Sequence, residues 1–171
     1  MGRLSKIKGV EILAQAMTKL IEQLPNVHLM FVGPDEDQIL PKIRARFERS
    51  NLLDYLHIAG AIEGEARRAY WAASDVFCLP SVAEGFSVAL IEALGAGLPA
   101  VITPGCHFEE VKSAGAGRIV LRNPDTLAMG LKEVLTNPER ALMGRKAREL
   151  VMNKYTWENI VRQYEKIINQ I

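Results

Sequence analysis

Cysteine, histidine and aromatic residues are scarce in this chain of 171 residues, which contains two cysteines, three histidines and 6% aromatic side chains. Cys78 lies in an apolar run and Cys106 in a loop, so the pair does not make a disulfide framework, and we expect a reducing, cytoplasmic setting. No cluster of histidine, cysteine and aspartate has the spacing of metal ligands. The sequence therefore offers no candidate metal site.

Excess charge of either sign and long apolar runs are also missing. The 21 basic residues almost balance the 20 acidic ones, which argues against a nucleic-acid partner. No apolar run approaches the length that a membrane-spanning helix needs, and the N-terminus does not have the pattern of a signal peptide. Arg44, Arg46 and Arg49 form one basic helix face, which is either solvated or a contact for anionic lipid.

Short apolar runs alternate with longer amphipathic stretches along most of the chain. This alternation predicts an α/β fold, a Rossmann-like doubly wound parallel sheet with helices on both faces, followed by a helical C-terminal tail in which Trp157 anchors the last helix. The expected strands are 26–32, 55–58, 76–79, 100–102 and 118–121. The expected helices are 10–24, 38–49, 64–73, 87–94, 125–135, 139–153 and 157–168.

The first helix has no strand before it. It begins near Gly9, and only a short segment with basic residues, 1–8, precedes it. Because a strand ordinarily leads into such a loop in an α/β fold, we expect that one strand is missing. The chain is then a single domain, residues 1–171, taken from a larger protein.

Two carboxylates are the most informative residues. Glu84 opens a loop that contains Gly85, and Glu92 lies inside the following helix, whose other residues are almost all apolar. Since an ionised group in an apolar setting is costly without a partner, we expect a ligand to be that partner. The alternative for Glu92 is a carboxylate that the protein itself satisfies.

Two cations and a helix start complete the candidate site. Arg3 and Lys8 lie in the loop before the first helix and are suited to phosphate oxygens, although a solvated basic loop is the alternative. Ser87 is typical of an N-cap, and the amides at a helix start attract anions. Ligands of open parallel sheets bind at the carboxyl ends of the strands. Cations for phosphate and two carboxylates for hydroxyl groups together describe a sugar nucleotide.

Motifs along essentially the whole chain resemble the C-terminal, donor-binding half of a retaining glycosyltransferase of family 4, which has the GT-B architecture. The resemblance is carried by Arg3 with Lys8-Gly9, by Gly33, by residues 74–81, by the block from Glu84 to Glu92, and by residues 97–101 and 155–157. It implies transfer of a hexosyl group from a nucleotide-diphosphate sugar with retention at the anomeric carbon. It also implies no metal and no cofactor other than the donor substrate, a UDP-, GDP- or ADP-sugar.

The resemblance implies three catalytic residues. Arg3 and Lys8 match the pair that neutralises the donor diphosphate, and Glu84 matches the carboxylate that holds hydroxyls of the transferred sugar. The implied substrate-binding residues are Gly85 and Phe86 near sugar and phosphate, Ser87 and Val88 at the helix start that supports the diphosphate, and Glu92 on the ribose.

The match has departures and leaves partners open. The family's glycine-rich turn reads Thr103 to Val111 here, and His107 within it either faces the sugar or fills a loop. The N-terminal acceptor-binding domain, the expected partner of this domain, is absent, so we expect weak donor binding and no transfer by the isolated chain. A peripheral membrane contact through the full-length enzyme is a further option. The alternative function is a non-catalytic nucleotide-binding or interaction module of the same fold.

Overall fold

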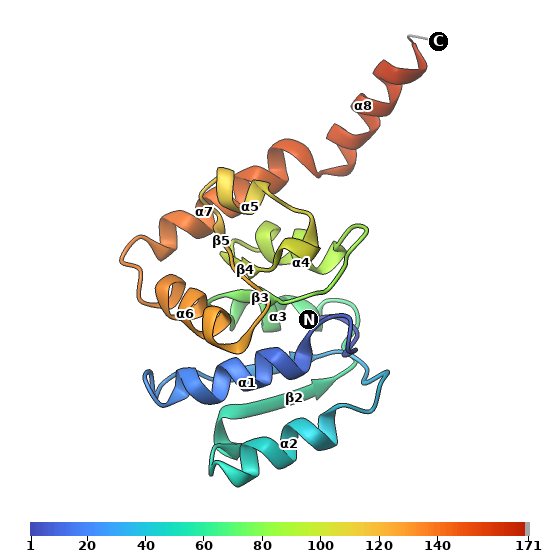
Figure 1. Ribbon diagram of the computed structural model, residues 1–171. Helices are drawn as coiled ribbons and strands as arrows, with labels where there is room; N and C mark the ends of the chain where they lie inside the picture. The colour runs from blue at the N-terminus through green and yellow to red at the C-terminus, as the bar shows by residue number, and fades with distance from the viewer. Residues whose placement is uncertain (170–171) are drawn as a thin grey trace.

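The computed structural model describes residues 1–169, in which parallel strands alternate with helices (Figure 1). The last two positions of the predicted domain 1–171 lie outside the described residues. The strands are β1 (Leu29–Val32), β2 (Leu56–Gly60), β3 (Phe77–Leu79), β4 (Ala100–Ile102) and β5 (Gly117–Ile119). The helices are α1 (Val10–Ile21), α2 (Leu40–Arg49), α3 (Ala66–Ala72), α4 (Val88–Gly95), α5 (Glu110–Ser113), α6 (Pro124–Leu135), α7 (Arg140–Lys154) and α8 (Trp157–Ile168), with 3₁₀ turns η1 (Leu53–Tyr55) and η2 (Pro104–Cys106).

The strands form two parallel sheets. β1 pairs with β2, and Leu29 lies opposite Leu56. β4 lies between β3 and β5, so that Ala100 is opposite both Phe77 and Gly117. The prediction of a parallel α/β fold is confirmed. Within residues 1–169, however, no ladder of hydrogen bonds joins β1 to β3, so the expected sheet is divided in two.

Two apolar cores correspond to the two sheets. In the first, α1 and α2 contact each other and share one core with β1, with Leu20 and Phe47 fully buried. In the second, α4, α5 and α7 cover the three-stranded sheet, with Leu94 and Val111 fully buried. Helix α6 packs against α1 and also against β4 and β5, so it links the two halves into one body.

The strand and helix predictions hold for every element, with the predicted ends for β4 and α8 and with shifted ends for the others. β1 begins at Leu29 rather than at residue 26, because its partner strand starts at Leu56, directly after the η1 turn, and offers no earlier ladder position. The short helix α5 was not predicted from the sequence, because residues 110–113 make too few turns to show a period.

Two expectations about burial are wrong. Trp157 does not anchor the last helix: its surface is 83% exposed, and α8 extends away from the body without a buried residue (Figure 1). Helix α4 is apolar except for Glu92, which predicts a helix buried all round, but it is buried on one face only, through Leu90, Ala93 and Leu94. Val88 on its other side is exposed.

Among the described residues, none of the helices combines the length and apolarity needed to cross a bilayer.

Candidate functional site

The candidate site lies where two loops meet at the carboxyl end of β3. The loop of residues 2–9 precedes α1, and the loop of residues 80–87 joins β3 to α4. The Val82 amide donates to the Ile7 carbonyl over 2.9 Å, which fastens one loop to the other. Gly9 has a φ of 70° and passes so close to Pro80 that a Cβ would lie 2.1 Å from the Pro80 carbonyl oxygen. Only glycine permits this approach.

A half-buried ion pair occupies the junction of the loops. Lys8 Nζ lies 2.6 and 2.7 Å from the two carboxylate oxygens of Glu84. The side chains are 24% and 6% exposed. The fully buried Ser81 hydroxyl also donates to Glu84. Glu84 therefore has three hydrogen bonds in the protein itself, at a place where the sequence predicted a ligand.

The second carboxylate also has a cationic neighbour. Glu92, on α4, pairs with Arg67 on α3, and both side chains are about one-third exposed. The guanidinium Nε of Arg67 lies 3.4 Å from Met1 Sδ. Burial, reinforced by the Arg67 charge, lowers the pKa of the Met1 α-amino group to about 6. The protein thus offers Glu92 a partner of its own, the alternative raised by the sequence.

Arg3 points to a different neighbour from Lys8. Its Nη1 donates to Glu36 over 3.1 Å, and the two side chains are 68% and 40% exposed. The backbone beside Arg3 is nevertheless close to α4, because a Cβ at Gly2 would lie 3.9 Å from the Ala89 side chain. Arg3 therefore lies on the same loop as Lys8 and pairs with a surface carboxylate.

The helix start follows the sequence prediction. Ser87 is the N-cap of α4, and its hydroxyl accepts from the Leu90 amide over 3.3 Å. Phe86 and Val88 are both largely exposed, and the Phe86 ring lies 6.1 Å from that of Tyr155. A Cβ at Gly85 would meet no atom within 4 Å, so the space above this residue is open.

Sequence reasoning missed three residues at the site. Ser81 donates to Glu84, and Arg67 donates to Glu92. Arg122 Nε donates to the Pro80 carbonyl over 2.9 Å. Ser81 falls within residues 74–81, one of the segments that carried the resemblance, so the sequence could have indicated it. The two arginines come from α3 and from the chain after β5, and no spacing links them to the carboxylates.

Two other polar features of the sequence take defined positions in the structure. Asp35 and Asp37 have an Asp-x-Asp spacing that the sequence reasoning overlooked, and both carboxylates accept backbone bonds: Asp35 from Ile39 and Leu40, and Asp37 from Lys6. His107 is exposed in a left-handed conformation with φ 49°. Residues 1–169 contain no group of three or more His, Cys, Asp or Glu side chains placed to hold a metal ion.

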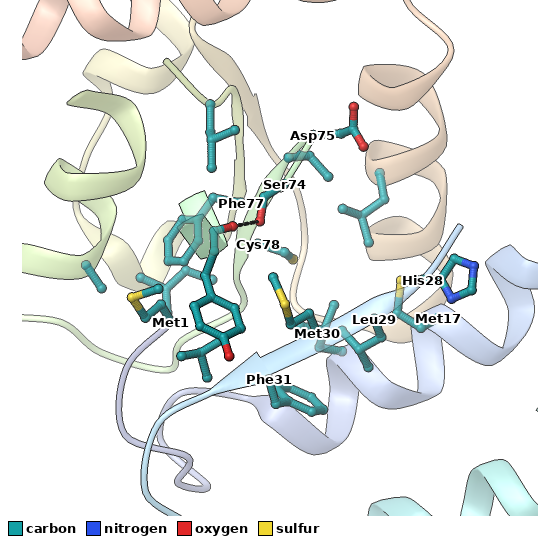
Figure 2. Close-up of a pocket in the computed structure, with 18 of the residues that line it drawn as sticks. Met1, Met17, His28, Leu29, Met30, Phe31, Ser74, Asp75, Phe77 and Cys78 are labelled. Atoms are coloured by element: carbon teal, nitrogen blue, oxygen red, sulfur yellow. Dashed lines mark hydrogen bonds between the residues drawn. The ribbon is translucent and has the colours of Figure 1, made fainter. Parts of the chain in front are cut away.

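A cavity of about 1000 Å³ opens beside the site. Lys8 and Ser87 line one end of it, but neither Glu84 nor Glu92 does. Part of its wall comes from the strands β1 and β3, from which Figure 2 labels Met30, Phe31, Phe77 and Cys78.

The family model of the glycosyl transferases group 1 matches residues 1–137. The chain belongs to this family. An uncharacterized glycosyltransferase of Methanocaldococcus jannaschii is 31% identical over 95% of this chain and 42% of its own length. The phosphatidyl-myo-inositol mannosyltransferase of Mycolicibacterium smegmatis is 30% identical over 94% of this chain and 42% of its own length. The chain thus spans less than half of these relatives.

Solved structures agree with the fold. Sucrose-phosphate synthase from Thermosynechococcus elongatus superposes with a TM-score of 0.82 at 27% identity, over 99% of this chain and 45% of that one. Anabaena HepE, solved with UDP and glucose, has a TM-score of 0.83 at 19% identity, over 99% of this chain and 48% of that one, a likeness of fold alone. This group 1 glycosyltransferase domain therefore has the GT-B, Rossmann-like arrangement.

Proposed function

We propose that this domain binds the nucleotide-diphosphate sugar donor of a retaining hexosyltransferase of glycosyltransferase family 4. The observation that carries the proposal is the convergence of Lys8, Glu84 and Ser81 at the N-terminal end of α4. A cation, a hydrogen-bonding carboxylate and a helix start with unpaired amides supply the groups that a glycosylated diphosphate requires.

Lys8 and Glu84 together suit both parts of the donor, its diphosphate and its sugar. The diphosphate would lie against the first amides of α4, where the helix dipole favours negative charge, and Lys8 would face its oxygens. Glu84 would then accept hydrogen bonds from sugar hydroxyls, and the open space above Gly85 leaves room for the ring. As the bond from the anomeric carbon to the phosphate oxygen breaks, negative charge grows on the diphosphate. Lys8 and Arg3 would stabilise that charge.

Arg3 would have to leave its present partner, Glu36, to take part. Its present pair with Glu36 is exposed on both sides, and exposed pairs contribute about 0–1 kcal/mol. The donor diphosphate, which carries two negative charges in all, would compete with Glu36 easily. Glu92 would accept the ribose hydroxyls while Arg67 holds the carboxylate in place.

The comparisons support the donor class. One relative is a mannosyltransferase by name, and HepE was solved with UDP and glucose. Retention, independence of metal and a cytoplasmic location are parts of the same proposal. So are the partners: an N-terminal acceptor-binding domain, and through it an occasional contact with a membrane surface.

Calorimetry with UDP-glucose and GDP-mannose tests the proposal. We expect at least one of them to bind, and Lys8→Ala to weaken it by about 1–3 kcal/mol, or one to two decades in affinity. Lys42→Ala is the matched control, because Lys42 pairs with Glu11 on α1 and with no residue of the candidate site. Equal affinities for the Lys8 variant and the wild-type chain, both confirmed as folded, would overturn the assignment.

A non-catalytic nucleotide-binding module is the second candidate, because Glu84 already has protein partners and needs no sugar to satisfy it. Glu84→Gln separates the two. A loss of affinity for the nucleotide sugar, with unchanged affinity for the bare nucleoside diphosphate, supports the transferase. Equal affinity of wild type for both ligands, unaltered by the variant, supports the module.

A further inference from the structure

The loop of residues 80–87, which joins β3 to α4, is fixed firmly at its start. The Ser81 carbonyl accepts from the Thr103 hydroxyl over 2.7 Å, and the Glu84 amide donates to the Gly105 carbonyl over 2.8 Å. Both bonds run to the η2 turn that follows β4, and β4 lies beside β3 in the same sheet. The start of the loop is therefore tied to the sheet.

The end of the loop lacks such bonds. Within residues 1–169, no backbone carbonyl accepts a hydrogen bond from the Gly85 or the Phe86 amide. Backbone with few hydrogen bonds and open space around it is mobile unless a side chain holds it. The two amides follow Glu84 directly, so they lie beside the place where the sugar ring of the proposed donor would bind.

The Phe86 side chain supplies an anchor for this segment. Although it is 58% exposed, its ring centroid lies 6.1 Å from that of Tyr155, and the two ring planes are tilted by 47°. Tilted aromatic pairs at this separation attract each other beyond the area that they bury. Because more than half of Phe86 is open to solvent, its position depends largely on Tyr155.

Tyr155 is itself held from three directions. Its ring centroid lies 5.3 Å from that of the buried Phe108, and its hydroxyl donates to Glu110 Oε1 over 3.2 Å. Its amide donates to the Val151 carbonyl of α7 over 2.8 Å. Phe108 and Glu110 belong to the segment between β4 and β5. Tyr155 thus joins a fixed part of the three-stranded half to the loosely held end of the loop.

We propose that Tyr155 is a positioning residue for the sugar of the donor. By holding the Phe86 ring, it fixes this residue's amide and the preceding one beside Glu84. The role rests on the proposed function of the domain, and it requires no contact between Tyr155 and the ligand. Amides that are fixed before binding spare the ligand part of the cost of ordering the loop.

The ratio of two affinities separates this role from a purely structural one, because a loss of stability changes both affinities by the same factor. Calorimetry would compare UDP-glucose with UDP, and GDP-mannose with GDP. We expect Tyr155→Leu to weaken the nucleotide sugar by about three- to tenfold, as the loss of one aromatic pair does, and to leave the nucleoside diphosphate unchanged. Tyr155→Phe keeps the ring and should bind as wild type does. Trp157→Leu is the matched control, since Trp157 is 83% exposed.

Phe86→Leu tests the same pair from its exposed side, where a change is tolerated by the fold. It should reproduce the loss seen in Tyr155→Leu, and the double variant should lose no more than either, because both changes remove one shared contact. NMR order parameters of the Gly85 and Phe86 amides, measured without ligand, should fall below about 0.6 in both leucine variants and stay at the wild-type level in Tyr155→Phe.

The outcomes distinguish this role from the proposed function. Equal losses for nucleotide sugar and nucleoside diphosphate, additive losses in the double variant, or unchanged order parameters would each overturn the role of Tyr155. A wild-type chain that prefers the nucleotide sugar, with the same preference in Tyr155→Leu, would overturn this role alone. A wild-type chain that binds no nucleotide sugar would overturn the proposed function, and the role with it.

Discussion

The loop of residues 2–9 carries two cations whose surroundings differ. Lys8 and its partner Glu84 are 24% and 6% exposed, whereas Arg3 and its partner Glu36 are 68% and 40% exposed. Water and side-chain entropy offset most of the attraction in an exposed pair, while a pair withdrawn from water depends strongly on both members. The loop therefore has one firmly placed cation and one that a ligand can redirect at little cost.

Displacing the whole loop should have the largest effect. In Gly9→Ala the new Cβ would meet the Pro80 carbonyl at 2.1 Å with φ at 70°. Backbone strain and overpacking, each about 1–3 kcal/mol, should lower the free energy of unfolding by about 4 kcal/mol. Urea denaturation measures this. Gly64→Ala is the control, since Gly64 has φ 62° but open space around its Cβ. Equal losses in both variants would show that the two loops are not in contact.

Removing one carboxylate at a time sharpens the contrast between the pairs. Glu84→Ala leaves a half-buried ammonium and the buried Ser81 hydroxyl without their acceptor, so unfolding should become easier by about 2–3 kcal/mol. Glu36→Ala should cost less than about 1 kcal/mol. The check is the denaturant midpoint of wild type and of each variant at low and high salt. The effect of Glu36→Ala should shrink at high salt, whereas the effect of Glu84→Ala should not change. A Glu84 variant as stable as the Glu36 variant would remove the distinction.

A third polar pair extends the comparison to a neutral donor and should give the smallest effect. Tyr155 Oη lies 3.2 Å from Glu110 Oε1, and burial followed by the Glu110 charge raises the pKa of Tyr155 to about 12. Below pH 10 the phenol is neutral in both the folded and the unfolded chain. Between pH 10 and pH 12 it ionises only when unfolded, so this contribution to stability is lost as the pH rises.

Tyr155→Phe should therefore flatten the decline in stability over that alkaline window without changing its course near neutrality. The measurement is the difference in denaturant midpoint between wild type and variant, followed across pH. An unchanged difference from neutral to alkaline pH would mean that the phenol is not withdrawn from water.

The sequence predicted the alternation of strands and helices because burial imposes local periods, and α8 was placed residue for residue at Trp157–Ile168. It also singled out Glu84, which opens a loop containing Gly85, and Glu92, since a charge stands out in an apolar helix. The sequence could not predict the partners of these two carboxylates. Arg67 comes from α3, and Lys8 lies 76 positions from Glu84, so no local pattern joins them.

Exposure was the other quantity that the sequence could not supply. An apolar pattern predicts that a face will be covered, but not by what. Trp157 and the outer side of α4 follow the pattern of buried residues and are exposed here. The same holds for the divided sheet: the alternation of strands and helices predicted one sheet, and only the structure shows that β1 and β3 are not hydrogen-bonded to each other.

By itself, the sequence determined the class of fold and the residue types of the site, because hydrophobic period, glycine placement and isolated charges act over a few positions of the chain. The tertiary structure decided which charges meet, how far each is withdrawn from water, and where the sheet is interrupted. Those outcomes depend on contacts between distant segments, whose energies are set only when the loops pack together.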